Sequence, residues 1–177
     1  MRKEKLDEIL KLEPDDETWK KLPADSLEKI KQGDESFLKT GREYYKNFIT
    51  TVQEIIDIPY PESYRQLEEL TQKSVKDAST NPGAVFAVIF AQTLPKLLSM
   101  EIRYKTSANA LNCALGIYAH KAEAGKLPDD IPVDSPKDLF SGRNFEYEKT
   151  KNGFVLRCRG RDLFEDKIHE YEFKVPE

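Results

Sequence analysis

The sequence has few of the residues that build disulfide scaffolds, metal centres or membrane spans. It has two cysteines and two histidines among 177 residues, and no Cys-x-x-Cys pair that would favour a zinc ribbon or a thioredoxin-like motif. The longest apolar run, residues 84–91, is short beside the roughly 20 residues that a spanning helix needs. The first residues are charged, unlike the apolar core of a secretory signal. We therefore expect no membrane contact by this chain itself.

The chain also lacks an excess of positive charge. The formal net charge is −4, and 34% of the residues are charged. Arg157, Arg159 and Arg161 form a basic cluster, but acidic neighbours dilute it. Binding to a nucleic-acid duplex needs clustered positive charge against phosphates, so we expect no nucleic-acid partner. Aromatic residues make up 10% of the chain, which is too many for a disordered protein.

The motifs of common enzymes are missing. There is no Gly-x-Ser-x-Gly, no Walker loop, no Gly-x-Gly-x-x-Gly and no His-x-x-x-His. We therefore expect no enzymatic activity and no cofactor. The alternative is a small-ligand-binding domain or an enzyme whose pocket lies between a helical part and a sheet. A deep pocket lined by convergent polar groups such as His120, His169 and Arg157 would favour this alternative over a non-enzymatic domain.

Apolar residues recurring at spacings of three and four predict several helices. Their expected ranges are 34–57, 61–78, 84–92 and 95–124. Pro59 and Pro61 stop the first helix because proline lacks the amide donor, and Gly125 ends the last one. No internal repeat is evident.

The helix expected at 95–124 carries two apolar stripes, which predicts that it packs on two sides. One stripe is expected to face the sheet and the other the helix at 34–57. The first stripe is Leu97, Tyr104, Ala108, Leu111, Leu115, Tyr118 and Ala122, and the second is Leu98, Ile102, Ala110, Cys113 and Ile117.

Three segments near the C-terminus alternate apolar and polar residues, which predicts a small antiparallel sheet with one buried face. They begin near Phe145, Phe154 and Glu170. Asn152 and Gly153 are expected to supply positive φ in a hairpin turn. The predicted fold is α+β: one domain over 1–177, with a charged N-terminal segment (1–33), a helical part (34–125) and a sheet part (126–177).

The C-terminal third also carries an ordered set of short motifs. A helix ends in Ala-Leu-Gly-Ile-Tyr-Ala-His-Lys-Ala-Glu-Ala-Gly-Lys-Leu-Pro at 114–128, followed by Asp138-Leu139-Phe140-Ser141-Gly142, Phe145-Glu146-Tyr147, Gly153-Phe154-Val155-Leu156 and Gly160-Arg161-Asp162. This order resembles uncharacterised bacterial envelope proteins that are common in planctomycete-like genomes. It is also similar to the globular end of type II secretion major pseudopilins. The resemblance implies a long helix packed on a small antiparallel sheet.

The chain departs from that pattern in several places. Leu139 stands where the pattern has proline, and the helices before residue 93 have no pseudopilin counterpart. The calcium loop that closes the pseudopilin pattern corresponds here to residues 162–167, which keep three carboxylates but lack the glycines. Asp162, Glu165 and Asp166 are therefore the candidate calcium ligands, since calcium prefers carboxylate oxygens. Arg161 and Lys167 flank this set and argue against strong binding, so an unoccupied acidic turn is expected.

The two cysteines leave three alternatives open: buried thiols, a disulfide or a reactive thiol. Cys113 lies on the helix stripe and Cys158 on the strand face, so packing of the helix on the sheet would bring them near one another. Together with the resemblance, these features predict a non-enzymatic cell-envelope domain that acts through contacts with other proteins. The sequence identifies neither the partners nor the oligomeric state. If the chain is a piece of a longer protein, export or membrane anchoring is expected; otherwise the cytoplasm is.

Overall fold

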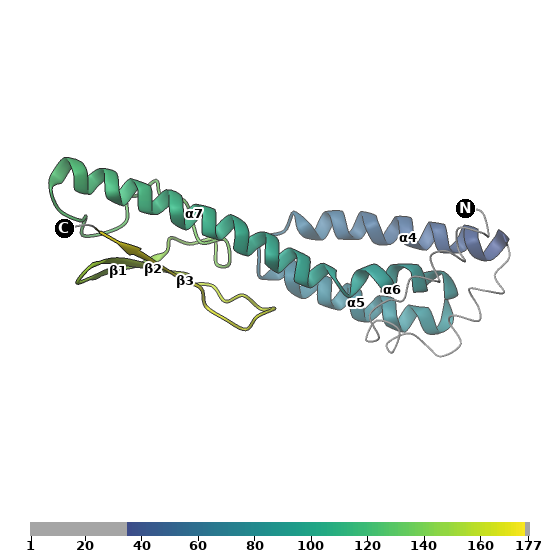
Figure 1. Ribbon diagram of the computed structural model, residues 1–177. Helices are drawn as coiled ribbons and strands as arrows, with labels where there is room; N and C mark the ends of the chain where they lie inside the picture. The colour runs from purple at the N-terminus through teal and green to yellow at the C-terminus, as the bar shows by residue number, and fades with distance from the viewer. Residues whose placement is uncertain (1–34, 176–177) are drawn as a thin grey trace. The chain divides into compact units, whose positions relative to one another are not determined.

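The computed structural model describes residues 35–175, so the charged segment expected at 1–33 lies outside the described residues. The elements are α4 (Glu35–Ile56), α5 (Glu62–Thr80), the short 3-10 helix η1 (Pro82–Ala84), α6 (Val85–Ala91), α7 (Leu94–Ala124), β1 (Glu146–Thr150), β2 (Gly153–Arg157) and β3 (Glu170–Lys174) (Figure 1). The α+β class and the long helix beside a three-stranded antiparallel sheet are confirmed.

The chain divides into two compact units whose boundaries differ from the predicted helical and sheet parts. One unit runs to Gln53 and resumes over Glu68–Thr93; the other consists of Glu54–Leu67 and Leu94–Glu177. That the whole chain is one domain stays a prediction.

The first unit is a small helical cluster. Its buried centre is made by Ala78, Ala84, Val85 and Val88, with Tyr44, Val75 and Phe86 packed against them. α4 and the start of η1 approach so closely that a Cβ on Gly83 would lie 2.6 Å from the Gly41 Cα. The Tyr44 hydroxyl donates a hydrogen bond of 2.8 Å to Asp77 of α5, which ties two helices of this unit together.

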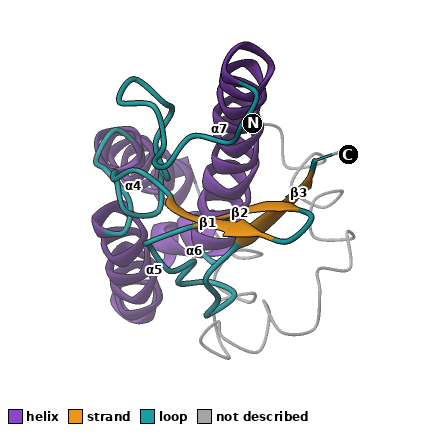
Figure 2. Cartoon of the chain, turned by 90° about the vertical axis from the view of Figure 1, so that its left-hand side faces the viewer, coloured by secondary structure: helices purple, strands orange, loops and turns teal. Residues whose placement is uncertain are grey.

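In the second unit, α7 runs along the sheet (Figure 1), and Figure 2 shows this pair turned by 90°. The strand order is β1-β2-β3, and the register pairs Leu156 with both Tyr147 and Tyr171. The Tyr118 ring of α7 meets the Phe154 ring edge-on at a centroid distance of 5.5 Å. The Tyr118 hydroxyl donates to the Lys174 carbonyl at 2.7 Å, so this contact combines apolar burial with a hydrogen bond.

Only one of the two α7 stripes is buried. In the second predicted stripe Leu98, Ala110, Cys113 and Ile117 are buried and Ile102 is half-buried. The prediction that the first stripe is also covered is wrong: its large side chains, Tyr118 excepted, are exposed. A helix lying on one small sheet is covered on one face, and the opposite face remains at the surface.

The hairpin between β1 and β2 is present, with Thr150 paired with Gly153, but its predicted backbone is wrong. Among the described residues, positive φ occurs only at Gly125, Gly142 and Asp166. Gly153 is required for another reason: a Cβ there would lie 1.9 Å from the Phe173 carbonyl oxygen on β3. Gly125, with φ of 73°, ends α7 as predicted.

Within the described residues, one stretch passes a simple test for membrane crossing. Val85–Ala124 contains an 18-residue window of mean hydropathy 1.4, long and apolar enough by those measures, and 39% of the window is buried inside the protein. The length of the longest uninterrupted apolar run, residues 84–91, did not reveal this stretch, because single polar residues interrupt its apolar residues. Core helices of soluble proteins pass the same test, so the absence of membrane contact stays a prediction.

Candidate functional site

Two similar loops flank the sheet. Asp138 opens one loop and Asp162 the other, and each is followed by Leu-Phe and closed five residues later by a basic residue, Arg143 or Lys167. Each loop is closed by an isolated β-bridge, between Asp138 and Arg143 and between Asp162 and Lys167. The residues with positive φ, Gly142 and Asp166, occupy the same place in the two loops. This repeat was missed in the sequence because it is only a few residues long.

Asp138 is fully buried and holds two loop segments together. One carboxylate oxygen accepts the Phe140 amide at 2.9 Å. The other accepts the Ser141 hydroxyl at 2.7 Å and the amides of Arg159 and Gly160, both at 2.9 Å. A buried carboxylate is stable only when its lone pairs are used, and here four donors use them.

Asp162 does the same for the second loop and connects it to α7. Its Oδ1 accepts the Ser99 hydroxyl at 2.7 Å and the amides of Phe164 and Glu165 at 3.0 and 3.2 Å. Its Oδ2 lies 3.2 Å from Nε2 of His169. Asp162 is fully buried, so these contacts replace its lost hydration.

The predicted calcium ligands are not gathered as a set of three. Asp162 and Glu165 lie together with His169, their ligand atoms within 4.8 Å of one another. Asp166 instead pairs with Arg161 at 2.5 Å, and Glu165 pairs with Arg103 of α7. Protein donors thus engage Oδ1 of Asp162 and the carboxylates of Glu165 and Asp166, and that no cation is held here stays a prediction.

The polar groups named for the alternative pocket do not converge. His120 is exposed on α7, and Arg157 pairs with Glu170 at 2.8 Å. His169 stacks on Phe140 with a centroid distance of 5.3 Å and touches Asp162. None of the three lines the pocket described below.

Both cysteine thiols are free and buried. Burial raises the pKa of Cys113. Burial and the nearby Asp138 carboxylate raise the pKa of Cys158. A thiol whose pKa is raised is a poor nucleophile, because the thiolate is the reactive form. These are buried structural thiols, the first of the three alternatives.

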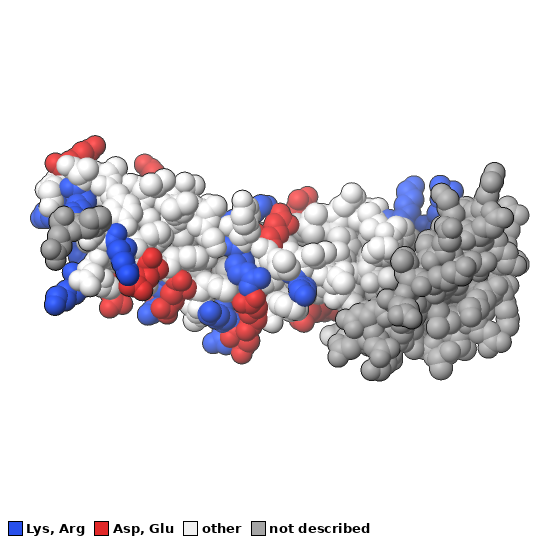
Figure 3. Space-filling model, in the orientation of Figure 1, with Lys and Arg blue, Asp and Glu red and all other residues white. Residues whose placement is uncertain are grey.

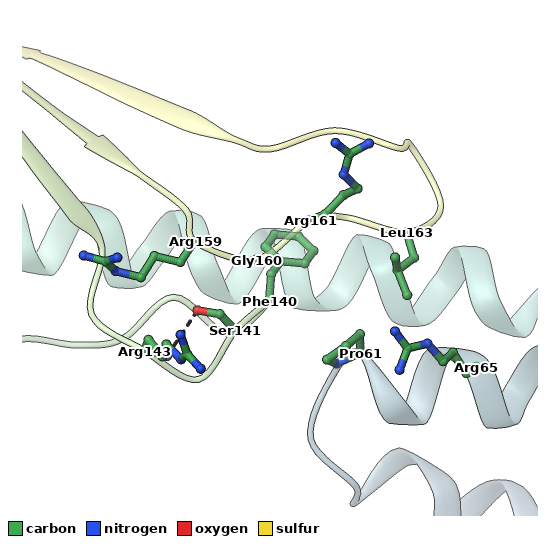
Figure 4. Close-up of a pocket in the computed structure, with 9 residues that line it drawn as sticks. All are labelled: Pro61, Arg65, Phe140, Ser141, Arg143, Arg159, Gly160, Arg161 and Leu163. Carbon is green, nitrogen blue, oxygen red and sulfur yellow. Dashed lines mark hydrogen bonds between the residues drawn. The ribbon is translucent and has the colours of Figure 1, made fainter.

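Four arginines line one pocket of about 330 Å³ beside the Asp138 loop. They come from three segments: Arg65 from the first turns of α5, Arg143 from the Asp138 loop, and Arg159 and Arg161 from the segment after β2 (Figure 4). Phe140 and Leu163 contribute apolar wall. The sequence showed the cluster at 157–161 but could not show that the chain brings Arg65 and Arg143 to it.

Comparisons of this chain with protein-family models, with curated proteins and with solved structures find no match. Functional conclusions therefore rest on the geometry of the chain itself.

Proposed function

We propose that this protein is a non-enzymatic interaction domain that contacts other protein molecules through one face of α7. A single observation carries the proposal. Five large apolar side chains of α7 are exposed by 44% to 78%: Leu97, Met100, Tyr104, Leu111 and Leu115. Their spacings of three, four and seven residues put them on one face of the helix. In Figure 3 the surface over α7 is largely white, whereas charges of both signs interleave over the sheet and its loops.

The area of this apolar stripe matches a protein contact. With roughly 200 Å² per large side chain, the five together expose on the order of 500 Å². Apolar patches of that size on a soluble surface commonly mark interaction sites. If an equal area is contributed from the other side, the contact buries about 1,000 Å², the lower bound for a specific interface.

The occupant that fits best is a second copy of this chain. Leu97 and Leu115 lie at equal distances from Thr106 along α7, and so do Tyr104 and Ala108. Two copies of α7 packed antiparallel about Thr106 therefore place leucine opposite leucine and the large tyrosine opposite the small alanine. In a two-fold interface every contact between two different residues occurs twice, once in each direction, and alternating large and small side chains interdigitate. The five stripe residues carry no charge. The same register puts Leu111 opposite Glu101, whose carboxylate is paired with Lys105 at 2.6 Å, so the contact buries no unpaired ion.

We keep a pseudopilin-like role in the cell envelope as part of this proposal. Its support is the arrangement of α7 on a three-stranded antiparallel sheet, which is what the resemblance of the C-terminal third implies. Fractionation of cells that express the natural full-length protein tests it. Recovery of the protein with the envelope supports the role, and recovery only with the cytosol contradicts it.

The dimer is tested by sedimentation equilibrium of the full chain from about 1 to 100 µM, the range of weak specific association. We expect a monomer–dimer equilibrium that Leu115→Lys abolishes, since a charge on the stripe would be buried. Lys96→Glu is the matched control, because it changes charge on the exposed surface of α7 outside the stripe. A wild-type protein that stays monomeric throughout contradicts the proposal.

The orientation has its own test. We mix Leu97→Cys protein with Leu115→Cys protein and oxidise the mixture. The antiparallel arrangement predicts disulfide-linked heterodimers. Cross-linked homodimers of each variant would instead show that the helices pair in parallel. Because Cys113 and Cys158 are buried, the native cysteines contribute little background.

A further inference from the structure

The arginine pocket is a separate feature from the α7 stripe, and its charge is unusual. Among the described residues no acidic side chain lines it, although four arginines do. Three of these have acidic partners outside the lining: Arg65 has Glu62 at 3.8 Å, Arg159 has Glu146 at 3.1 Å and Arg161 has Asp166 at 2.5 Å. Arg143 pairs with no acidic group in the described part of the chain. The pocket therefore presents net positive charge to whatever enters it.

The pocket floor is built rigidly. Gly160 passes so close to Phe140 that a Cβ there would lie 2.3 Å from the Phe140 carbonyl carbon. The Asp138 carboxylate accepts hydrogen bonds from both the Phe140 and the Gly160 amides, which fixes this close approach. It also holds the Arg159 amide. The backbones that carry Arg143 and Arg159 are thus fixed by one buried side chain.

The opposite wall is attached to this floor. The Tyr60 ring meets Phe140 edge-on at a centroid distance of 5.3 Å. The Tyr60 hydroxyl accepts the Leu163 amide at 2.5 Å. Tyr60 precedes Pro61, which lines the pocket, and α5 carries Arg65 one turn later. These contacts hold the start of α5 and its arginine beside the other three.

We propose that this pocket binds the phosphate group of a small ligand. Guanidinium groups match the geometry of phosphate oxygens and form paired, charge-assisted hydrogen bonds with them. In Figure 4 the guanidinium groups of Arg159 and Arg161 extend away from Pro61 and Arg65, toward their acidic partners Glu146 and Asp166. Arg65 and Arg143 are therefore the donors that we assign to the phosphate. The volume of about 330 Å³ is in the range of small-molecule pockets. Phe140 and Leu163 provide an apolar surface for an organic body attached to the phosphate.

The test is calorimetric titration of the full chain at constant ionic strength with three probes: inorganic phosphate, phenyl phosphate and benzoate. We expect saturable binding of phenyl phosphate, and binding at least about tenfold weaker in Arg143→Gln, a loss equivalent to about 1.4 kcal/mol. Arg143 is exposed and its guanidinium joins no ion pair in the described chain, so the variant should fold normally. Its far-ultraviolet circular dichroism and melting temperature verify this.

Arg157→Gln is the matched control, since Arg157 is the last residue of β2, two residues before Arg159, and does not line the pocket. It should bind phenyl phosphate as the wild type does. Equal affinity for inorganic and phenyl phosphate would identify free phosphate as the ligand, and tighter phenyl phosphate a phosphate ester. Three results would overturn the proposal: no saturable binding of either phosphate, preference for benzoate, or equal losses in the two variants. None of them bears on the α7 dimer, which Arg143→Gln leaves intact.

Discussion

Replacing Asp138 tests the central structural assignment, because this buried carboxylate holds two loop segments and the pocket floor. In Asp138→Asn the amide nitrogen replaces one oxygen. The side-chain amide is least unfavourable with its nitrogen in the place of Oδ1, where this nitrogen faces only the Phe140 amide donor. Its oxygen then takes the place of Oδ2 and still accepts from the Arg159 and Gly160 amides. One bond to a charged group is lost and one buried donor is left unpaired, so we expect a loss of about 2 kcal/mol. Asp138→Ala leaves all four donors without their acceptor, and about 4 kcal/mol is expected.

The assay is urea unfolding followed by circular dichroism, with hydrogen exchange measured at the Arg159 and Gly160 amides. Destabilisation should lower the midpoint in both variants. Exchange at these two amides should accelerate much more in Asp138→Ala than in Asp138→Asn, which keeps their acceptor. The control is Asp134→Asn, since Asp134 is exposed in a loop and should change stability by less than about 0.5 kcal/mol. If Asp138→Ala costs less than about 1 kcal/mol, the carboxylate does not organise the loops and the reasoning fails.

Three further predictions follow from the same structure. Burial and the hydrogen bond to Asp77 raise the pKa of Tyr44 to about 12. The contribution of the protonated Tyr44 hydroxyl to stability should be complete below about pH 10 and lost as the pH rises towards 12. The free energy of unfolding in urea should therefore decline less at alkaline pH in Tyr44→Phe than in the wild type. Leu156→Ala, at a fully buried site, should cost about 2–5 kcal/mol in chemical unfolding, whereas Val133→Ala, at a site that is 90% exposed, should cost almost nothing; equal effects would contradict the assigned core. Adding EDTA should shift the melting temperature by no more than about a degree, because protein donors already engage Asp162; a rise of several degrees with calcium that Asp162→Ala abolishes would show a metal site.

The sequence located the helices well. The expected ranges 34–57 and 95–124 became Glu35–Ile56 and Leu94–Ala124, because helical periodicity, Pro59 and Gly125 are local signals. The sheet also followed from alternation of polar and apolar residues. By contrast, the backbone of the hairpin turn was predicted wrongly, since the need for Gly153 arises from the neighbouring strand β3.

The candidate sites were harder to predict. Asp162 and Glu165 do lie together, but His169 and not Asp166 completes the cluster. Asp138 was quoted only as part of a motif, although its four hydrogen bonds organise the pocket floor. Its partners at Arg159 and Gly160 are distant in the sequence, and no periodicity indicates a bond between a side chain and a remote amide.

The helices and strands, their ends and their apolar faces could be predicted from local patterns, because propensity and periodicity act over a few residues. Which of the two α7 stripes is covered emerged only in the folded chain, since burial depends on how much surface the sheet offers. It also decided that Arg65 and Arg143 join the arginines after β2 around one pocket. Convergence of distant charges depends on the path of the whole chain, which no local pattern contains.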